Sequence, residues 1–160
     1  MTSDFSHFDD SGNAVMVDVT AKSITSRSAT ASCKITMKPE TILAIKQQKL
    51  AKGDVITVAQ IAGISAAKQT HHLIPLCHPL PLSAIKIDYE FSKDQRSIVL
   101  SSTIKVTGKT GVEMEALTSV SIAALTVYDM CKSVDKSISI HETKLIEKYG
   151  GKSGTYKADQ

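Results

Sequence analysis

Apolar and polar residues begin to alternate at residue 29 of this chain. The apolar members of the run are Ala29, Ala31, Cys33, Ile35 and Met37. A period of two puts successive side chains on opposite faces of a strand. The pattern therefore predicts a half-buried strand from residue 29 to residue 37.

Two helices are predicted directly after this strand. Pro39 suits a first helical turn and Glu40 complements its positive dipole end, so we expect a helix from Pro39 to about Leu50. Asp54 is a plausible N-cap for a second, alanine-rich helix that continues to Thr70. Gly63 within it either weakens the helix by ~1 kcal/mol relative to alanine or permits another helix to approach closely.

An apolar loop and a hairpin are expected next. Residues 73–82 contain three prolines, which excludes a helix or a central strand and favours an ordered loop. Alternation then returns twice, from Ile85 to Phe91 and from Ile98 to Val106, with a polar turn at residues 92–97 between the runs. This arrangement predicts an antiparallel hairpin.

The remaining elements define the fold class. A long apolar helix starts at about Glu113, and residues 137–148 look like a last strand. The order strand, two helices, hairpin, long helix and strand predicts an α+β fold of the ferredoxin-like type, an antiparallel sheet with helices packed on one face. Residues 1–22 are polar and read as a loose N-terminal arm, partly ordered around residues 16–19. Residues 23–160 form one catalytic domain with a flexible, glycine-rich C-terminal tail from residue 150.

Composition narrows the class of protein without naming a ligand. The 160 residues suffice for one domain with a real core. No apolar run approaches the ~20 residues of a membrane span and no signal pattern opens the chain, so we predict a cytoplasmic protein without a membrane partner. Cys33, Cys77 and Cys131 are widely spaced and form no CxxC pair, which favours reduced thiols. A net charge of +3 is too small to indicate nucleic acid.

The long helix carries ionisable residues at both ends. Glu113 and Glu115 start it, and Asp129 and Lys132 end it. Acids that complement the helix dipole and an ordinary ion pair three residues apart would explain these positions without a function. Beside apolar walls, however, the same groups would have the perturbed pKa values that proton transfer needs.

The length of this helix bears on whether the ionisable residues at its two ends can share one functional site. Glu115 and Asp129 are fourteen residues apart, which is ~21 Å along a helix axis. One small-molecule site cannot easily use both ends of a straight helix. If both ends are functional, the site is assembled across a subunit boundary of a symmetric homo-oligomer.

Two further signals are weak when taken singly. His78 lies between Cys77 and Pro79, where rigid neighbours would hold a binding or catalytic group, although a lone histidine is more often structural and a metal site lacks further ligands. Lysine–glycine segments at residues 51–54, 108–111 and 150–154 favour a polyphosphate or sulfate-like ligand. Residues 103 and 146 are not glycine, so neither GKT nor GKS forms a Walker A loop.

Several motifs together resemble a known family. They are MVDV (16–19), KGDV (52–55), IAGISAAK (61–68), LIPLCHPL (73–80), VTGKTGVEMEALT (106–118), ALTVYDMCK (124–132) and GGKSG (150–154). In this order they resemble the cyclic pyranopterin monophosphate synthase family, the MoaC-type accessory protein of molybdenum cofactor biosynthesis. His71 and His72 depart from the acid-and-aromatic pair that is more usual there.

The resemblance implies an assembly and a reaction. The subunit would be ferredoxin-like and would form a hexamer, a trimer of dimers, with its pocket at a dimer interface. The enzyme would be a lyase that converts (8S)-3′,8-cyclo-7,8-dihydroguanosine 5′-triphosphate into cyclic pyranopterin monophosphate and diphosphate. It implies no cofactor and no protein-held metal, with Mg²⁺ entering only on the triphosphate.

The resemblance also assigns roles to residues. Asp129 would be the principal acid–base residue with Lys132 as its partner, His78 would share in the proton transfers, and Glu113 would support them. The residues expected to bind substrate are Leu76, Cys77, His78, Met114 and Glu115 around the ring system, and Lys52, Lys148 and Arg27 at the phosphates.

Two other classes of protein compete with an enzyme. A non-catalytic nucleotide-binding module could use the same lysines to hold a triphosphate. An RNA-binding ferredoxin-like sheet ranks last, because only Tyr89 and Phe91 supply aromatic rings on the predicted strands.

Overall fold

The computed structural model describes residues 7–9, 11–152 and 154–158. Their regular elements are β1 (Thr25–Thr36), α1 (Pro39–Lys46), α2 (Val55–Lys68), α3 (Thr70–Leu73), β2 (Leu82–Phe91), β3 (Ser97–Gly108), α4 (Glu113–Cys131), β4 (Ser139–Tyr149) and β5 (Tyr156–Lys157).

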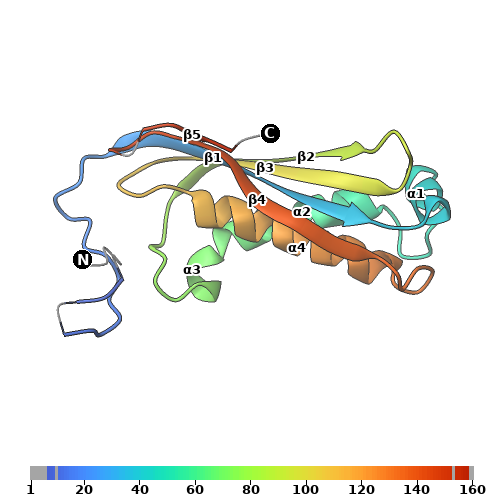
Figure 1. Cartoon of the computed structure of the whole chain (residues 1–160), viewed down its shortest axis with the longest axis horizontal. Coiled ribbons are helices and arrows are strands. Elements are labelled where there is room, and N and C mark those ends of the chain that lie inside the picture. Colours follow the sequence, from blue (N-terminus) through green and yellow to red (C-terminus); the bar gives the residue numbers. More distant parts are fainter. Residues whose placement is uncertain (1–6, 10, 153, 159–160) are drawn as a thin grey trace.

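The strands form one antiparallel sheet in the order β2-β3-β1-β4-β5. Helices α2 and α4 pack against each other and lie on one face of this sheet (Figure 1). The predicted hairpin is present as β2 and β3, with Ile85 opposite Ile104. The α+β class and the placement of the helices on one face are confirmed, and they are consistent with a ferredoxin-like fold.

The core lies between the sheet and α4. The alternating apolar residues of β1 are buried, as predicted from their period of two. On the helix side the buried positions are mostly small, among them Ala116, Ala123 and Ala124. Small residues let α4 lie close to both the sheet and α2.

Helices α2 and α4 lie in close contact at Gly63. A β-carbon added there would lie 2.9 Å from the Ser119 carbonyl oxygen and 2.5 Å from Cδ1 of Ile87. Of the two explanations for this glycine, close helix packing is therefore the correct one.

A buried carboxylate joins the end of α4 to the start of α1. Asp135 is 1% exposed, and its Oδ2 accepts hydrogen bonds from the Lys38 backbone N–H (2.9 Å) and the Thr41 hydroxyl (3.1 Å). Its Oδ1 accepts from the backbone N–H and the hydroxyl of Ser137. Burial alone would raise the pKa of Asp135, but these hydrogen bonds lower it to about 2.

Several boundaries differ from the expected ones. Helix α1 ends at Lys46 rather than near Leu50, because Gln48 adopts a left-handed backbone (φ 53°) that a helix cannot continue through. The loop predicted from residue 73 begins one residue later, since Leu73 ends α3. Strand β5 lies within the tail and was not predicted, because two residues are too few for a periodic signal.

None of the helices in the described part of the chain combines the length and apolar character that crossing a membrane requires.

Candidate active site

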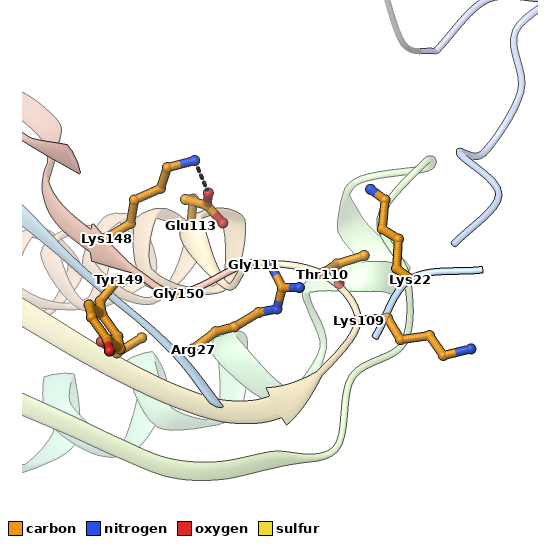
Figure 2. Close-up of a pocket in the computed structure, with 10 residues that line it drawn as sticks. Lys22, Arg27, Lys109, Thr110, Gly111, Glu113, Lys148, Tyr149 and Gly150 are labelled. Atoms are coloured by element: carbon orange, nitrogen blue, oxygen red, sulfur yellow. Dashed lines mark ion pairs between the residues drawn. The ribbon is translucent and has the colours of Figure 1, made fainter. Parts of the chain in front are cut away.

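A cavity lined by cations lies at the N-terminal end of α4. Four basic residues from four segments of the chain contribute to its lining, together with Thr110, Gly111 and Glu113 (Figure 2). The basic residues are Lys22, Arg27, Lys109 and Lys148. We call this the basic cavity. Such a concentration of positive charge is suited to a polyanionic group.

Local structure fixes two of these cations. Arg27 donates from Nε to the Gly108 carbonyl oxygen (3.0 Å), which ties the guanidinium to the end of β3. Gly151 has a positive φ (77°), and a β-carbon there would collide with the guanidinium of Arg27. Lys148 lies opposite Ala29, a core-facing residue, and its ammonium pairs with Glu113 at 2.9 Å.

A second cavity adjoins the basic cavity and shares Lys22, Thr110, Gly111, Glu113 and Lys148 with it. We call it the inner cavity. Its other walls come from the proline-rich loop, the first turn of α4 and the N-terminal arm. These residues are Leu76, Cys77, His78, Leu80, Met114, Glu115, His7, Val17 and Val19. A mixed apolar and ionisable lining is suited to a heterocycle that exchanges protons.

Glu115 is the most strongly perturbed group of the inner cavity. It is only 4% exposed, and burial raises its pKa from 4.5 to about 7, with the negative charge of Glu113 adding to the effect. Burial also raises the pKa of the Cys77 thiol, and the nearby Glu115 raises it further. Glu115 is therefore poised to gain or lose a proton near neutral pH, whereas Cys77 stays a thiol.

The N-terminal arm is part of these walls. Nε2 of His78 lies 2.9 Å from the Val17 carbonyl oxygen. A carbonyl can only accept, so Nε2 carries the proton and Nδ1 is free to accept one when the ring is neutral. Lys109 donates from its ammonium to the Thr20 carbonyl oxygen at 2.8 Å, which fixes the arm a second time.

A separate group lies at the other end of α4. The Asp129 carboxylate pairs with Lys132 at 2.6 Å and with Lys52 at 3.1 Å, and Lys52 also donates to the Asp129 carbonyl oxygen at 2.8 Å. Hydrogen bonds from Lys132 and Lys52 hold the pKa of Asp129 below its usual value. All three side chains are roughly half exposed to solvent.

The structure thus divides the expected site residues into two groups. Those that line the two cavities are Arg27, Leu76, Cys77, His78, Glu113, Met114, Glu115 and Lys148. Those at the far end of the helix are Lys52, Asp129 and Lys132.

Lys22, Lys109 and Thr110 are among the lining residues that had no individual role in the sequence-based site. Lys109 and Thr110 belong to the GKTG segment, whose glycines and lysine were the available signal. Lys22 carried no signal, because it reaches the cavities only through the path of the arm. Among the described residues, no three His, Cys, Asp or Glu side chains gather into a metal-binding group.

Fold and site first define a class of protein, an α+β domain with a cavity lined by basic side chains at the start of α4. Comparison with known proteins gives the family. The MoaC family model matches residues 16–151. The chain is 53% identical to the cyclic pyranopterin monophosphate synthase of Brevibacillus brevis, over 98% of this chain and 97% of that protein.

Proteins of the same name from two other organisms agree. The identity is 54% for Desulfitobacterium hafniense (96% of this chain, 93% of that protein) and 55% for Listeria monocytogenes (98% and 97%). The chain belongs to the MoaC family. The family expected from the sequence motifs is confirmed, and with it the prediction that the chain is an enzyme.

Proposed function

We propose that this chain converts (8S)-3′,8-cyclo-7,8-dihydroguanosine 5′-triphosphate into cyclic pyranopterin monophosphate and diphosphate, a step of molybdenum cofactor biosynthesis. The observation that carries the proposal is the pairing of two adjoining cavities. The basic cavity suits a triphosphate, and the inner cavity, which contains buried Glu115, suits the ring system to which the triphosphate is attached.

Charge stabilisation is the first requirement of this reaction. Diphosphate departs when the cyclic phosphate closes, so negative charge develops on the leaving oxygens. Lys22, Arg27, Lys109 and Lys148 surround the place where those oxygens would lie. Any Mg²⁺ would enter on the triphosphate as part of the substrate, in line with the sequence-based expectation.

Proton transfer is the second requirement. Rebuilding the ring system moves protons at nitrogens and hydroxyls, and a group whose pKa lies near the working pH does this best. Glu115, with a pKa of about 7, meets this condition inside the inner cavity. His78 adds a nitrogen that accepts a proton, and Glu113, paired with Lys148, orients its neighbours.

We further propose that Asp129 and Lys132 of one subunit complete the cavities of another. Fourteen residues of helix, ~21 Å, separate Asp129 from Glu115 within one chain, so one molecule cannot bring them to a single ligand. The exposure of the Lys52, Asp129 and Lys132 group supports this arrangement. The hexamer built as a trimer of dimers and the cytoplasmic location stay predictions.

The apolar outer surface of the two helices also supports association. Val58 and Ile61 on α2 and Leu125 on α4 are 40%, 62% and 54% exposed. Exposed aliphatic side chains on packed helices favour burial against another copy.

Asp129→Asn separates an enzyme from a non-catalytic nucleotide-binding module. We expect product formation to fall by at least 10²-fold, while binding of the cyclised triphosphate is retained, since the amide keeps the shape but not the acid–base function. Asp88→Asn is the matched control. Asp88 is an exposed aspartate on β2 that pairs with Lys86 at 2.8 Å. It lines neither the basic nor the inner cavity and does not belong to the Lys52, Asp129 and Lys132 group. Unchanged turnover in Asp129→Asn would exclude the assigned role.

Mixing of inactive subunits tests the shared site. Glu115→Gln and Asp129→Asn subunits are unfolded together in equal amounts and refolded. If each site takes one residue from each of two subunits, about one quarter of the sites combine two intact halves, and about one quarter of wild-type activity should return. No recovery in verified mixed oligomers would contradict a site shared between subunits.

A further inference from the structure

We propose that Thr110 is a substrate-binding residue, whose hydroxyl donates a hydrogen bond to a phosphate oxygen where the basic and inner cavities meet. This inference rests on the proposed function, since it takes the triphosphate of that substrate as the ligand. The Thr110 hydroxyl would give the triphosphate a neutral hydrogen-bond donor with a defined direction, in addition to the positive charge of the lysines and Arg27.

The position of Thr110 is the first observation. It lies between the end of β3 at Gly108 and the start of α4 at Glu113, and it lines both cavities. In Figure 2 it lies between Arg27 on one side and Lys22 and Lys109 on the other. A ligand that extends from one cavity into the other would lie along the residues that the two cavities share, and Thr110 is one of them.

The unused hydroxyl is the second observation. Oγ1 of Thr110 is buried and has no hydrogen-bond partner among the described residues. A buried hydroxyl without a partner destabilises the folded protein, and most such groups in proteins are satisfied. Thr126, by contrast, donates to the Ile122 carbonyl oxygen at 2.8 Å, as a threonine with a purely structural role would.

Rotation about the Cα–Cβ bond connects these two observations. A threonine outside a helix has more than one staggered rotamer. Rotation of the Thr110 side chain toward the cavity would break no hydrogen bond of its hydroxyl to any described residue. The donor would then face oxygens that are already drawn in by Lys22 and Lys148, the two cations common to both cavities. A hydrogen bond to an ionised phosphate oxygen is about twice as strong as one between neutral groups.

The test compares Thr110→Val, which has the same shape without the hydroxyl, with Thr110→Ser, which keeps the hydroxyl. We expect kcat/KM for the cyclised triphosphate to fall on the order of ten- to hundredfold in Thr110→Val and by less than about threefold in Thr110→Ser. The thermal midpoint of the free protein should stay equal or rise in Thr110→Val, because an unpaired buried hydroxyl is removed.

Inorganic triphosphate serves as an independent probe. Its stabilisation of the protein against heat should be reduced in Thr110→Val and preserved in Thr110→Ser. Wild-type kinetics in Thr110→Val, or a fall in activity accompanied by a lower thermal midpoint of the free protein, would overturn the assignment. If the wild-type protein fails to turn over the cyclised triphosphate while the triphosphate effect still depends on the hydroxyl, the proposed function fails and Thr110 as an anion ligand stands.

Discussion

At pH 8, the Glu115→Gln variant should be more stable than the wild type. At pH 4.5, the variant and the wild type should have nearly equal stability. The substitution replaces a buried carboxyl by a neutral group of the same shape. Below pH 4.5 the wild-type carboxyl is protonated in both the folded and the unfolded state, so it does not distinguish the two proteins. Above pH 7 the wild type carries a buried charge and the variant does not.

The magnitude follows from the pKa shift. The folded pKa of about 7 lies above the ordinary value of 4.5. Each unit is worth about 1.36 kcal/mol, so the full shift corresponds to about 3.4 kcal/mol. One side of the carboxyl faces a cavity that admits water, and we therefore expect about 2 kcal/mol. The sign is set by the raised pKa: wild-type stability is lost as the pH rises from 4.5 through 7.

Urea unfolding of both proteins at pH 4.5 and pH 8, at equal subunit concentration, measures this effect. The other titrating groups cancel in the difference between variant and wild type. Glu147→Gln is the matched control, because that carboxylate is about half exposed, pairs with Lys157 and lines neither cavity, and no gain is expected from it at pH 8. A stability difference between Glu115→Gln and the wild type that does not change with pH would refute the reasoning.

Three further predictions concern packing, the buried carboxylate and the basic cavity. Gly63→Ala should destabilise the protein by about 1–2 kcal/mol in urea unfolding, since the added methyl meets Ile87 and overpacking outweighs the gain in helix propensity. Asp135→Ala should lower the unfolding free energy by about 3 kcal/mol or more, because it leaves buried donors unpaired. The wild type should lose about 2 kcal/mol of stability as the pH falls from about 4 to about 2, since this is the free energy that corresponds to the lowered pKa of Asp135. Lys148→Ala should weaken inorganic triphosphate binding about tenfold in calorimetry while changing stability by less than about 1 kcal/mol, because its pair with Glu113 is partly exposed.

Matched variants make these outcomes interpretable. Ser65→Ala is the control for Gly63→Ala. It also introduces an alanine into α2, but at an exposed position, and it should not destabilise the protein. Asp135→Asn keeps one acceptor and should lose less stability than Asp135→Ala. Lys144→Ala removes a lysine from the same strand that lines neither cavity, and a similar loss of triphosphate binding there would show that the effect is merely one of net charge.

Local pattern was sufficient for most of the fold. The alternation in β1 and β3 and the Asp54 cap of α2, which accepts from the Thr57 backbone N–H at 3.0 Å, are properties of neighbours along the chain. Helix α1 was predicted too long because only the backbone of Gln48 decides where it ends. The dipeptide strand β5 was missed because its stability comes from pairing with β4, not from its own residues.

The site was less accessible to sequence reasoning. Glu115 and His78, to which the family resemblance assigns a place in the substrate site, both line the inner cavity. The motifs did not identify Lys22 or Thr110, whose roles depend on how the arm and the β3–α4 turn meet in space. The spacing of residues along the chain does not show which distant segments come into contact in the folded structure.

By itself, the sequence determined the family, most of the longer elements and the separation of Glu115 from Asp129, because helix rise and hydrophobic period are local properties of the chain. Only the tertiary structure decided that the basic and inner cavities share a wall, that Glu115 is buried enough for a pKa of about 7, and that the hydroxyl of Thr110 has no partner within the described part of the chain. These properties arise from desolvation and from contacts between segments far apart in the chain, and they exist only once the sheet and helices have packed.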